Sequence, residues 1–451
     1  MLFNSWIFLF AFLPITYFVF WRLRSARSRH CWLTVAGYVF YGFWNAKFCL
    51  LMALSTAVSY LAGLGMLKWQ EPRRRRLCLI VPVAFDLALL GFFKYANLFL
   101  STARLPALDI VLPIGISFYT FHTITYIVDA YRRTITPTRD FFEFSCYVSF
   151  FPQLVAGPIV RFSQIERDLG AIGRADREES KEAGWSFFIL GLAKKVLLAD
   201  TIAAVIQPAL ADVGSLSTPS AWLCAFGYAY QLYFDFSGYS DMAVGLGRLF
   251  GLRLPQNFDS PYRALDPSDF WRRWHISLSS ILRDYLYIPL GGSRGSRAAT
   301  ARNVMITMLL GGLWHGASWT FAGWGAYHGL LLLLHRFVRP WWERMAPAIQ
   351  RTMTFLLVTL GWVLFRSGDW ATCGMWLSRM FRWSPGPLMP GALGLLIAGG
   401  IAAAIAHGAP NTGSLSHRWR SAPTLALAGL LVASVLVIAA GQESPFLYFQ
   451  F

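Results

Sequence analysis

The chain has 451 residues, of which 56% are apolar and only 14% carry a charge. A soluble domain is about 45–50% apolar and about 25% charged, so this composition argues against a soluble protein. Lys and Arg outnumber Asp and Glu by 40 to 23, but they stand in short runs between apolar stretches. Such runs are typical of membrane-protein loops rather than of a nucleic-acid surface. The six cysteines have neither metal-ligand nor CxxC spacing, and the sequence indicates an all-α polytopic membrane protein.

Apolar stretches recur along the whole chain. A helix needs about 20 apolar residues to cross the hydrocarbon core, and the sequence predicts about 10 to 12 such spans. No repeat, linker or low-complexity tract interrupts them, so we expect one integral-membrane domain over residues 1–451. The predicted spans are 2–21, 31–48, 49–67, 77–100, 110–130, 185–208, 221–250, 303–319, 321–336, 352–364, 391–407 and 425–440.

The basic loops predict the orientation of the chain. Arginine-rich runs follow the first, third and fifth predicted spans, and a longer one occupies residues 252–302. Loops rich in Lys and Arg stay on the cytoplasmic side. The N-terminus is therefore predicted to lie outside and the arginine loops in the cytoplasm. An even number of spans would return the C-terminal tail to the outside.

Two stretches do not have the pattern of ordinary spans. Residues 144–160 contain FPQLVAGP, whose prolines and glycine favour a re-entrant turn buried in protein. Residues 259–293 alternate aromatic and charged side chains too densely for a lipid-exposed span. That pattern favours helices that lie in the membrane interface and dip into the protein.

Several ionisable residues fall inside predicted spans, where each is a functional-site hypothesis. Most buried histidines are hydrogen-bonded structural residues, and we interpret His122 and His335 in that way. No HExxH motif or carboxylate partner accompanies His315, His328 and His335, so no metal site is expected. The ionisable residues in predicted spans include Asp86, His122, Asp235, Asp241, His315, His328 and His335.

His315 has a distinctive environment in the segment LLGGLWHGASW. Its neighbouring glycines allow close backbone approach, and the indoles of Trp314 and Trp319 can enclose an apolar cavity. An imidazole there has the pKa class of a general base near neutral pH. His275, between Trp274 and a group of serines, is the second candidate. The FSGYS segment does not supply a GxSxG nucleophile elbow, and a serine hydrolase is not indicated.

The motifs of the chain resemble those of the membrane-bound O-acyltransferase (MBOAT) family. The resemblance covers nearly the whole chain, is densest over residues 113–329, and is strongest toward the bacterial branch that acylates alginate and teichoic acid. The motifs are FPQLVAGPIVRF, YFDFSGYSDMAVGLGRLFG, NFDSPYRALDPSDFWRRWHISLSSILRDYLYIPLGGSR and LWHGASWTFAGWGAYHG. The resemblance implies a helical bundle around a central tunnel, in which an acyl group moves from a thioester to a hydroxyl.

The resemblance also implies roles for individual residues. His315 matches the family's histidine and would act as the general base. His275, or Asp269 or Arg273 beside it, would orient the donor or stabilise the oxyanion, although His275 could equally serve only to hold the interfacial helices together. The residues expected to line or support the tunnel are Trp314, Asp235, Asp241, Asp269 and Arg273.

The donor implied by the resemblance is acetyl-CoA, with an acyl-carrier protein as the alternative, and no bound cofactor is expected. The basic stretch around Arg272, Arg273 and Arg283 suits a phosphate-rich carrier, although positive-inside topology alone would also place arginines there. The implied partners are membrane lipids, a polysaccharide acceptor and a periplasmic acetyltransferase, with no nucleic acid. The implied location is the bacterial inner membrane.

The C-terminal tail, residues 441–451, reads GQESPFLYFQF. Aromatic residues at the end of a membrane protein are normally interface anchors. The tail also resembles an FxYxxF motif of this branch, which implies that Tyr448 could accept acetyl and pass it to an extracytoplasmic partner.

The predicted function is therefore export of acetyl groups for O-acetylation of an alginate-like or cellulose-like exopolysaccharide. Two alternatives stay open: an acyltransferase for lipid or protein hydroxyls, and a proton-coupled transporter that uses His315, Asp235 and Asp241. The absence of inverted-repeat symmetry argues against the transporter.

Overall fold

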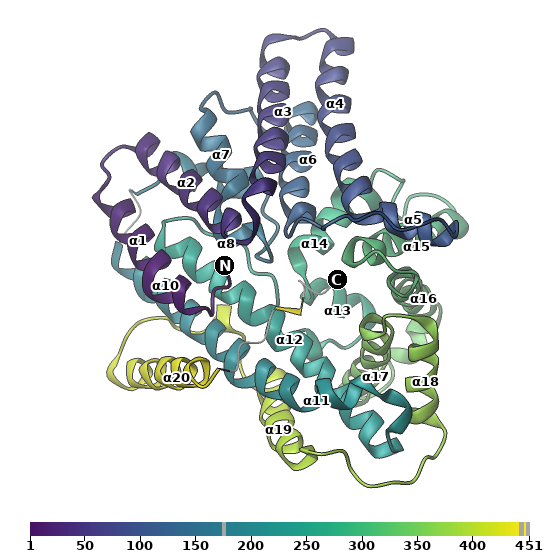
Figure 1. Ribbon diagram of the computed structural model, residues 1–451. Coiled ribbons are helices and arrows are strands. Elements are labelled where there is room, and N and C mark those ends of the chain that lie inside the picture. The colour runs from purple at the N-terminus through teal and green to yellow at the C-terminus, as the bar shows by residue number, and fades with distance from the viewer. Residues whose placement is uncertain (174–176, 442–445, 448–451) are drawn as a thin grey trace. The chain divides into compact units, whose positions relative to one another are not determined.

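A computed structural model describes residues 1–173, 177–441 and 446–447, with side chains omitted for residues 177–180. Within these residues every regular element is helical (Figure 1). The chain forms two compact units. The first contains residues 1–191, 239–255 and 417–429, and the second contains residues 192–238, 256–416 and 430–451. Helices α10, α12 and α20 continue from one unit into the other, and the single domain over residues 1–451 stays a prediction.

The first unit is built mainly from the N-terminal helices. Helices α3 and α4 stand side by side as an antiparallel pair in Figure 1, and α6 packs against both. The helices are α1 (Leu13–Arg22), α2 (Ala26–Asn45), α3 (Cys49–Lys68), α4 (Pro72–Leu90), α5 (Ala96–Thr102), α6 (Ile116–Arg132), α7 (Phe141–Ser149), α8 (Phe151–Leu154), α9 (Phe162–Gly170) and α10 (Arg177–Ala193).

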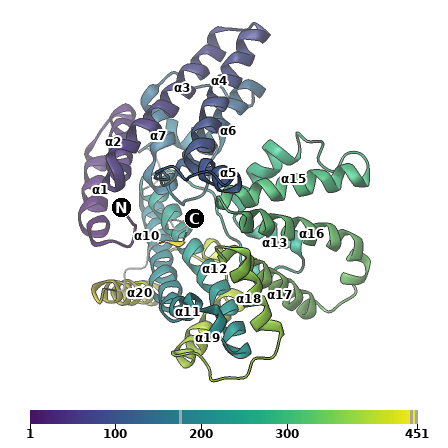
Figure 2. The same cartoon turned by 45° about the vertical axis from the view of Figure 1, so that its right-hand side comes forward.

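The second unit carries the segments with His275 and His315 and includes most of α12. Figure 2 shows α15 and α16 packed along one another as a helical hairpin. The helices are α11 (Thr201–Ala211), α12 (Thr218–Leu249), α13 (Pro267–Arg273), α14 (Ile276–Ile281), α15 (Arg297–His315), α16 (Trp319–Trp342), α17 (Pro347–Arg366), α18 (Trp370–Phe381), α19 (Ala392–Gly408) and α20 (Ser421–Ala439).

Every predicted span overlaps a helix or consecutive helices, but the fifth span begins six residues before α6, and residues 316–318 of the eighth span are not helical. Among the described residues, four helical segments are long and apolar enough to cross a membrane, and two further apolar helices are shorter. The four are Ala26–Lys68, Pro72–Thr102, Pro347–Arg366 and Ser421–Ala439, and the two are Phe8–Arg22 and Ala392–Gly408. The all-α membrane fold is confirmed, whereas the count of 10 to 12 spans stays a prediction.

Both irregular stretches are built from short, broken helices. Residues 144–160 are continuously buried, and α7 and α8 are interrupted at Phe150, as the two prolines and the glycine predict. A side chain at Gly157 would collide with the carbonyl oxygen of Pro152, so the turn requires glycine there. Residues 259–293 form α13, α14 and short helical turns of three to six residues.

Candidate functional site

His315 is the last residue of α15, and its side chain is 4% exposed. The imidazole Nδ1 lies 2.7 Å from the carbonyl oxygen of Gly311. Because a carbonyl oxygen can only accept, Nδ1 carries the proton and donates it to this bond. In the neutral ring, Nε2 then holds the lone pair. The backbone therefore holds His315 in the tautomer that a general base requires.

Aromatic rings surround His315. The ring centroids of Trp324, Trp314 and Phe365 lie 4.9, 5.1 and 5.5 Å from the imidazole. Trp314 thus contacts the imidazole, and its predicted role at the tunnel stays a prediction, whereas Trp319 is 47% exposed and does not enclose the ring. The indole that encloses the imidazole is instead that of Trp324, which lies about one and a half turns after Trp319 on α16. Side chains at these two positions lie on different faces of the helix, and the face with Trp324 points toward α15.

Glycines bring α15 and α16 close together beside His315. A Cβ atom at Gly312 would collide with the carbonyl oxygen of Phe321, and one at Gly325 would collide with the carbonyl oxygen of Met308. At Gly316, a Cβ would overlap the ring of Phe321. The predicted close backbone approach is therefore present, and it fixes the end of α15 against α16.

His275 is fully buried in a left-handed backbone conformation, with φ 44° and ψ 54°, at the start of α14. Its Nδ1 lies 3.1 Å from Oδ1 of Asn257. The same side-chain atom of Asn257 accepts hydrogen bonds from the backbone N–H and the hydroxyl of Ser277. Because a backbone N–H can only donate, this atom is the amide oxygen and not the amide nitrogen. His275 Nδ1 is therefore the donor in its bond to Asn257. A left-handed residue that is not glycine carries strain, which these contacts stabilise.

The structure brings His275 and His315 together, with ring centroids 6.4 Å apart and nearly perpendicular rings. Burial, and secondarily the proximity of His315, lowers the pKa of His275 well below its usual range. His275 is therefore neutral, with its proton on Nδ1. The sequence analysis did not single out Asn257. The available signal was its position at the start of the NFD motif, 18 residues before His275.

Asp235 is a member of a buried ionic cluster. Lys195 Nζ lies 2.5 Å from Asp235 and 2.7 Å from Asp200, and all three residues are almost fully buried. The other oxygen of Asp235 accepts a hydrogen bond of 3.0 Å from the backbone N–H of Leu447. This cluster thus fixes the described end of the tail.

The tail also reaches the histidine pair through aromatic contacts. The ring of Phe446 lies 5.9 Å from that of Phe236, which lies 4.7 Å from His275. Phe446 and Leu447 are both buried. Tyr448, the predicted acyl relay, lies outside the described residues.

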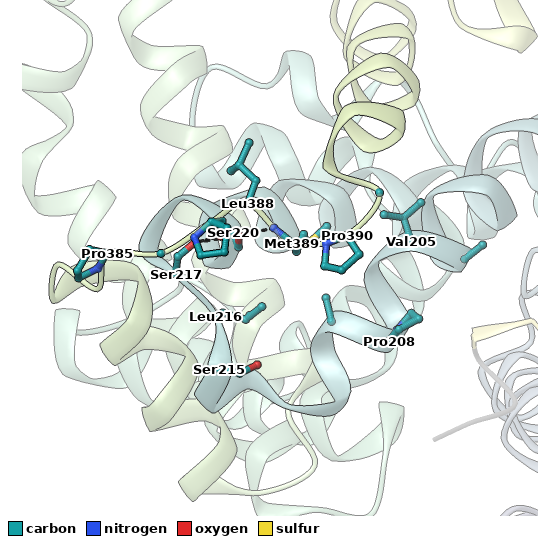
Figure 3. Close-up of a pocket in the computed structure, with 15 residues that line it drawn as sticks. Val205, Pro208, Ser215, Leu216, Ser217, Ser220, Pro385, Leu388, Met389 and Pro390 are labelled. Atoms are coloured by element: carbon teal, nitrogen blue, oxygen red, sulfur yellow. Dashed lines mark hydrogen bonds between the residues drawn. The ribbon is translucent and has the colours of Figure 1, made fainter.

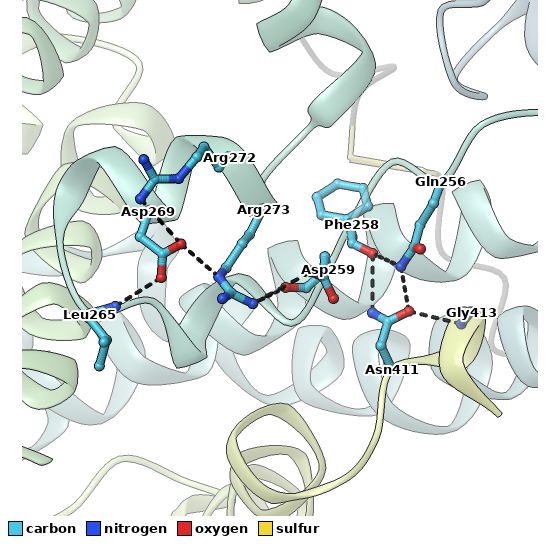
Figure 4. A network of polar contacts seen from close by, with 9 residues as sticks. All are labelled: Gln256, Phe258, Asp259, Leu265, Asp269, Arg272, Arg273, Asn411 and Gly413. Carbon is cyan, nitrogen blue, oxygen red and sulfur yellow. Dashed lines mark hydrogen bonds and ion pairs between the residues drawn. The ribbon is translucent and has the colours of Figure 1, made fainter. Parts of the chain in front are cut away.

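Asp269 and Arg273 form a polar network near the protein surface (Figure 4). Asp269 accepts a hydrogen bond of 3.0 Å from Arg273 Nε and forms an ion pair with Arg272. Arg273 also pairs with Asp259 at 3.5 Å.

Asp241, which was also predicted to line or support the tunnel, belongs to the first unit and is half-buried.

The other ionisable residues of the predicted spans have structural contacts. Asp86 accepts hydrogen bonds from Ser55 (2.7 Å) and Thr123 (2.6 Å), which ties α4 to α3 and α6. His122 accepts a bond from the backbone N–H of Val160. His335 lies 4.0 Å from Asp266. In the part of the chain that the structure describes, no three His, Cys, Asp or Glu side chains gather as a metal site.

A cavity of about 650 Å³ lies where α11 ends and α12 begins (Figure 3). The segment 385–391 closes it, and the hydroxyl of Ser220 accepts a bond from the backbone N–H of Met389. The loops that line this cavity, residues 212–217 and 385–391, are predicted from the basic-loop pattern to lie outside, and the extracytoplasmic position of the cavity stays a prediction.

Comparison with known proteins agrees with this geometry. Residues 108–378 match the model of the membrane-bound O-acyltransferase family. The chain is 40% identical over its full length to a probable alginate O-acetylase of Pseudomonas putida, which it also covers completely. It is 38% identical to a peptidoglycan O-acetyltransferase of Helicobacter pylori, over 81% of this chain and 77% of that protein. It is 31% identical to a teichoic acid D-alanyltransferase of Streptococcus thermophilus, over 49% of this chain and 56% of that protein.

The matched region contains the whole α15–α16 hairpin and the segments that carry Asn257, His275 and His315. Together with the apolar helices, it makes the chain a multi-pass membrane acyltransferase. The protein belongs to the membrane-bound O-acyltransferase family.

Proposed function

We propose that the protein takes acetyl groups from a cytoplasmic thioester, acetyl-CoA, and transfers them across the bacterial inner membrane for O-acetylation of an exopolysaccharide. Relatives named for alginate and peptidoglycan O-acetylation support a polysaccharide acceptor. The observation that carries the proposal is the fixed tautomer of His315, whose Nε2 is the lone-pair nitrogen inside an aromatic enclosure.

In the proposed reaction, His315 Nε2 removes the proton of an attacking hydroxyl while the hydroxyl oxygen bonds to the thioester carbonyl carbon. The tetrahedral intermediate collapses by breaking the carbon–sulfur bond, and the imidazolium returns its proton to the departing thiolate. The products are the acetyl ester and free thiol, and His315 is regenerated.

His275 has a different role in this proposal. With its proton donated to Asn257, its Nε2 can only accept a hydrogen bond, and burial keeps the ring neutral. A hydrogen-bond acceptor does not stabilise an oxyanion. The tautomer therefore favours an orienting role for His275 toward a hydroxyl or thiol over the predicted oxyanion role.

The acceptor hydroxyl belongs either to the polysaccharide or to an intermediate carrier that serves a periplasmic acetyltransferase. Tyr448 is the proposed carrier, and it follows directly after Leu447, whose backbone is bonded to Asp235. Acetyl transfer to Tyr448 would give a tyrosyl ester, from which the partner would take the acetyl group.

The test uses purified protein in nanodiscs with radiolabelled acetyl-CoA. We expect His315→Gln to reduce acetyl-CoA turnover by at least about a hundredfold, the usual contribution of a general base. His30→Gln is the matched control, because His30 is as buried as His315 but lies in the first unit, where its Nε2 is 3.1 Å from the backbone carbonyl oxygen of Leu169. Undiminished turnover in His315→Gln would refute the proposed base.

Label that remains covalently bound in wild type but not in Tyr448→Phe would support the relay. Label that is unchanged in Tyr448→Phe would refute it and leave the proposed base intact. If wild type turns over an acetylated carrier protein but not acetyl-CoA, the donor assignment is wrong.

A further inference from the structure

A second cavity, of about 390 Å³, opens beside the network in Figure 4. Three segments far apart in the sequence line it: the turn before α13 together with α13, the start of α17, and the loop after α19. Its charged lining residues are Asp259, Arg263, Arg273 and Arg351, and Asn411 and Ser414 are among its polar ones.

The lining of this cavity has three guanidinium groups and one carboxylate, a formal excess of two positive charges. Arg273 is held by Asp259 and Asp269. Within the described ranges, Arg263 and Arg351 form no ion pair with a carboxylate. Guanidinium groups that surround a cavity without partner carboxylates favour an anion, and phosphate suits their planar donor geometry.

The wall of the cavity is held in place by hydrogen bonds. Asn411 donates to the carbonyl oxygen of Phe258 (3.1 Å) and accepts from the backbone N–H of Gly413 (2.9 Å) and from Gln256 (2.5 Å), as Figure 4 shows. These bonds join the loop after α19 to the segment that precedes α13. Two of the three segments that line the cavity are therefore held together before a ligand binds, which lowers the entropic cost of binding.

The location of the cavity agrees with the predicted topology. All three lining segments fall in loops predicted to be cytoplasmic. Helix α19 begins at the cavity of Figure 3 and ends at this one, and its 17 residues span about 26 Å at 1.5 Å per residue. The two cavities therefore lie at opposite ends of a helix whose length approaches the thickness of the hydrocarbon core.

The cavity is connected to the histidine pair through the backbone. The N–H of Asp259 donates to the carbonyl of Arg273 (2.9 Å), and the N–H of Ile276 donates to the carbonyl of Asn257 (2.9 Å). These two bonds pair the segment that lines the cavity with the segment that carries His275. A ligand held by the arginines would thus lie at one end of the structure that positions the site.

We propose that this cavity binds phosphate groups through Arg263 and Arg351, and that the phosphates are those of the coenzyme A donor. The assignment of coenzyme A rests on the proposed function, whereas the inference that the cavity binds phosphate rests on the arginines that line it. An anionic lipid headgroup carries the same chemistry and is the other source. The arginines that the sequence suggested for this role, Arg272, Arg273 and Arg283, are each paired with an aspartate.

The experiment measures binding of radiolabelled coenzyme A and of 3′-dephospho-coenzyme A to the full chain in phosphatidylcholine nanodiscs. We expect Arg263→Gln/Arg351→Gln to weaken coenzyme A binding by about tenfold or more and to reduce the salt dependence of binding. Arg344→Gln is the matched control, because it removes an exposed arginine near the start of α17 that does not line the cavity. The control should stay within about twofold of wild type.

A second arm measures retention of labelled phosphatidylglycerol during purification. If the double variant loses phosphatidylglycerol but binds coenzyme A normally, the site is a lipid headgroup site and the donor assignment is overturned. If neither ligand is affected while the variant keeps its thermal unfolding temperature, the phosphate site itself is overturned. Coenzyme A binding that depends on both arginines in a protein without acetyl-CoA turnover would support this site and refute the proposed function instead.

Discussion

The carboxylate of Asp235 accepts a hydrogen bond from the backbone N–H of Leu447, 212 positions later in the chain, while its other oxygen pairs with Lys195. The cluster of Lys195, Asp200 and Asp235 therefore serves two purposes. It pairs buried charges between the helical segment Lys194–Asp200 and α12, and it holds the described end of the tail near Phe236 and His275. With two carboxylates and one ammonium group, the cluster has a formal charge of −1.

This charge predicts an order of stability among variants. Lys195→Met removes the ammonium group that pairs with both carboxylates and should cost about 3–5 kcal/mol, as is usual when one partner of a buried pair is removed. Asp235→Asn leaves Lys195 paired with Asp200, and the amide oxygen of the new asparagine can still accept the hydrogen bond from Leu447. This variant should therefore lose less stability than Lys195→Met. Thermal unfolding in detergent measures the order. A larger loss for Asp235→Asn would contradict the assignment of the cluster.

The close contact between α15 and α16 predicts the effect of a single methyl group. Gly312→Ala should cost about 1–3 kcal/mol through overpacking, because the new Cβ would collide with the carbonyl of Phe321. Activity should fall as well, since His315 lies three residues away. Gly399→Ala, in α19, meets no atom within 4 Å and should be neutral or stabilising by up to about 1 kcal/mol. Equal unfolding temperatures for the two variants would contradict the packing argument.

Asn257 predicts a change in pH dependence. Burial depresses the pKa of His275, so the wild-type enzyme should show no loss of activity from its protonation between pH 6 and 8. Asn257→Asp keeps an acceptor oxygen but adds a negative charge beside His275, which favours the imidazolium and raises its pKa. The acidic limb of the kcat–pH profile should therefore move to higher pH. An unchanged profile would show that His275 does not act through its neutral form.

Truncation of the Asn257 side chain gives a second test of its role. Asn257→Ala removes the acceptor of His275 Nδ1 and two further bonds to Ser277, and should lower kcat by about tenfold, the scale of a lost hydrogen bond. Ser279→Ala provides a control on the same short helix, because its hydroxyl bonds to the carbonyl of Trp274 and not to Asn257. Equal losses in the two variants would mean that any disturbance of α14 reduces activity.

The two cavities predict opposite accessibility. Ser215, beside the cavity of Figure 3, and Ser414, beside the arginine cavity, are both exposed. In intact spheroplasts, a membrane-impermeant maleimide should label Ser215→Cys directly, but should label Ser414→Cys only after the membrane is permeabilised. Wild type, with its native cysteines buried or half-buried, sets the background. The opposite pattern would invert the predicted topology.

Local patterns predicted the helices well because apolar runs, prolines and glycines act over short distances. Each predicted span overlaps a helix, and the broken backbone after Phe144 follows from Pro152 and Gly157. His315 stood out for the same reason, since its glycine neighbours are adjacent in the sequence.

The residues that contact His315, Asp235 and His275 could not be predicted from local sequence patterns. Trp324 rather than Trp319 encloses His315, because the helix turn decides which indole faces α15. Lys195, which could have extended to the interface, is buried with Asp200 and Asp235. Asn257 reaches His275 through a backbone pairing that no local periodicity records. Each of these contacts depends on tertiary packing.

The burial of Phe446 and Leu447 limits how the protein can be handled. A fusion partner attached after Phe451 would begin four residues beyond Leu447, which is 3% exposed and bonded to Asp235. At the other end, Phe3 is fully buried and the terminal amine contacts the carbonyl of Phe40. Affinity handles at either terminus would therefore compete with packed side chains. An insertion within residues 101–109, which are exposed throughout, leaves both ends in place.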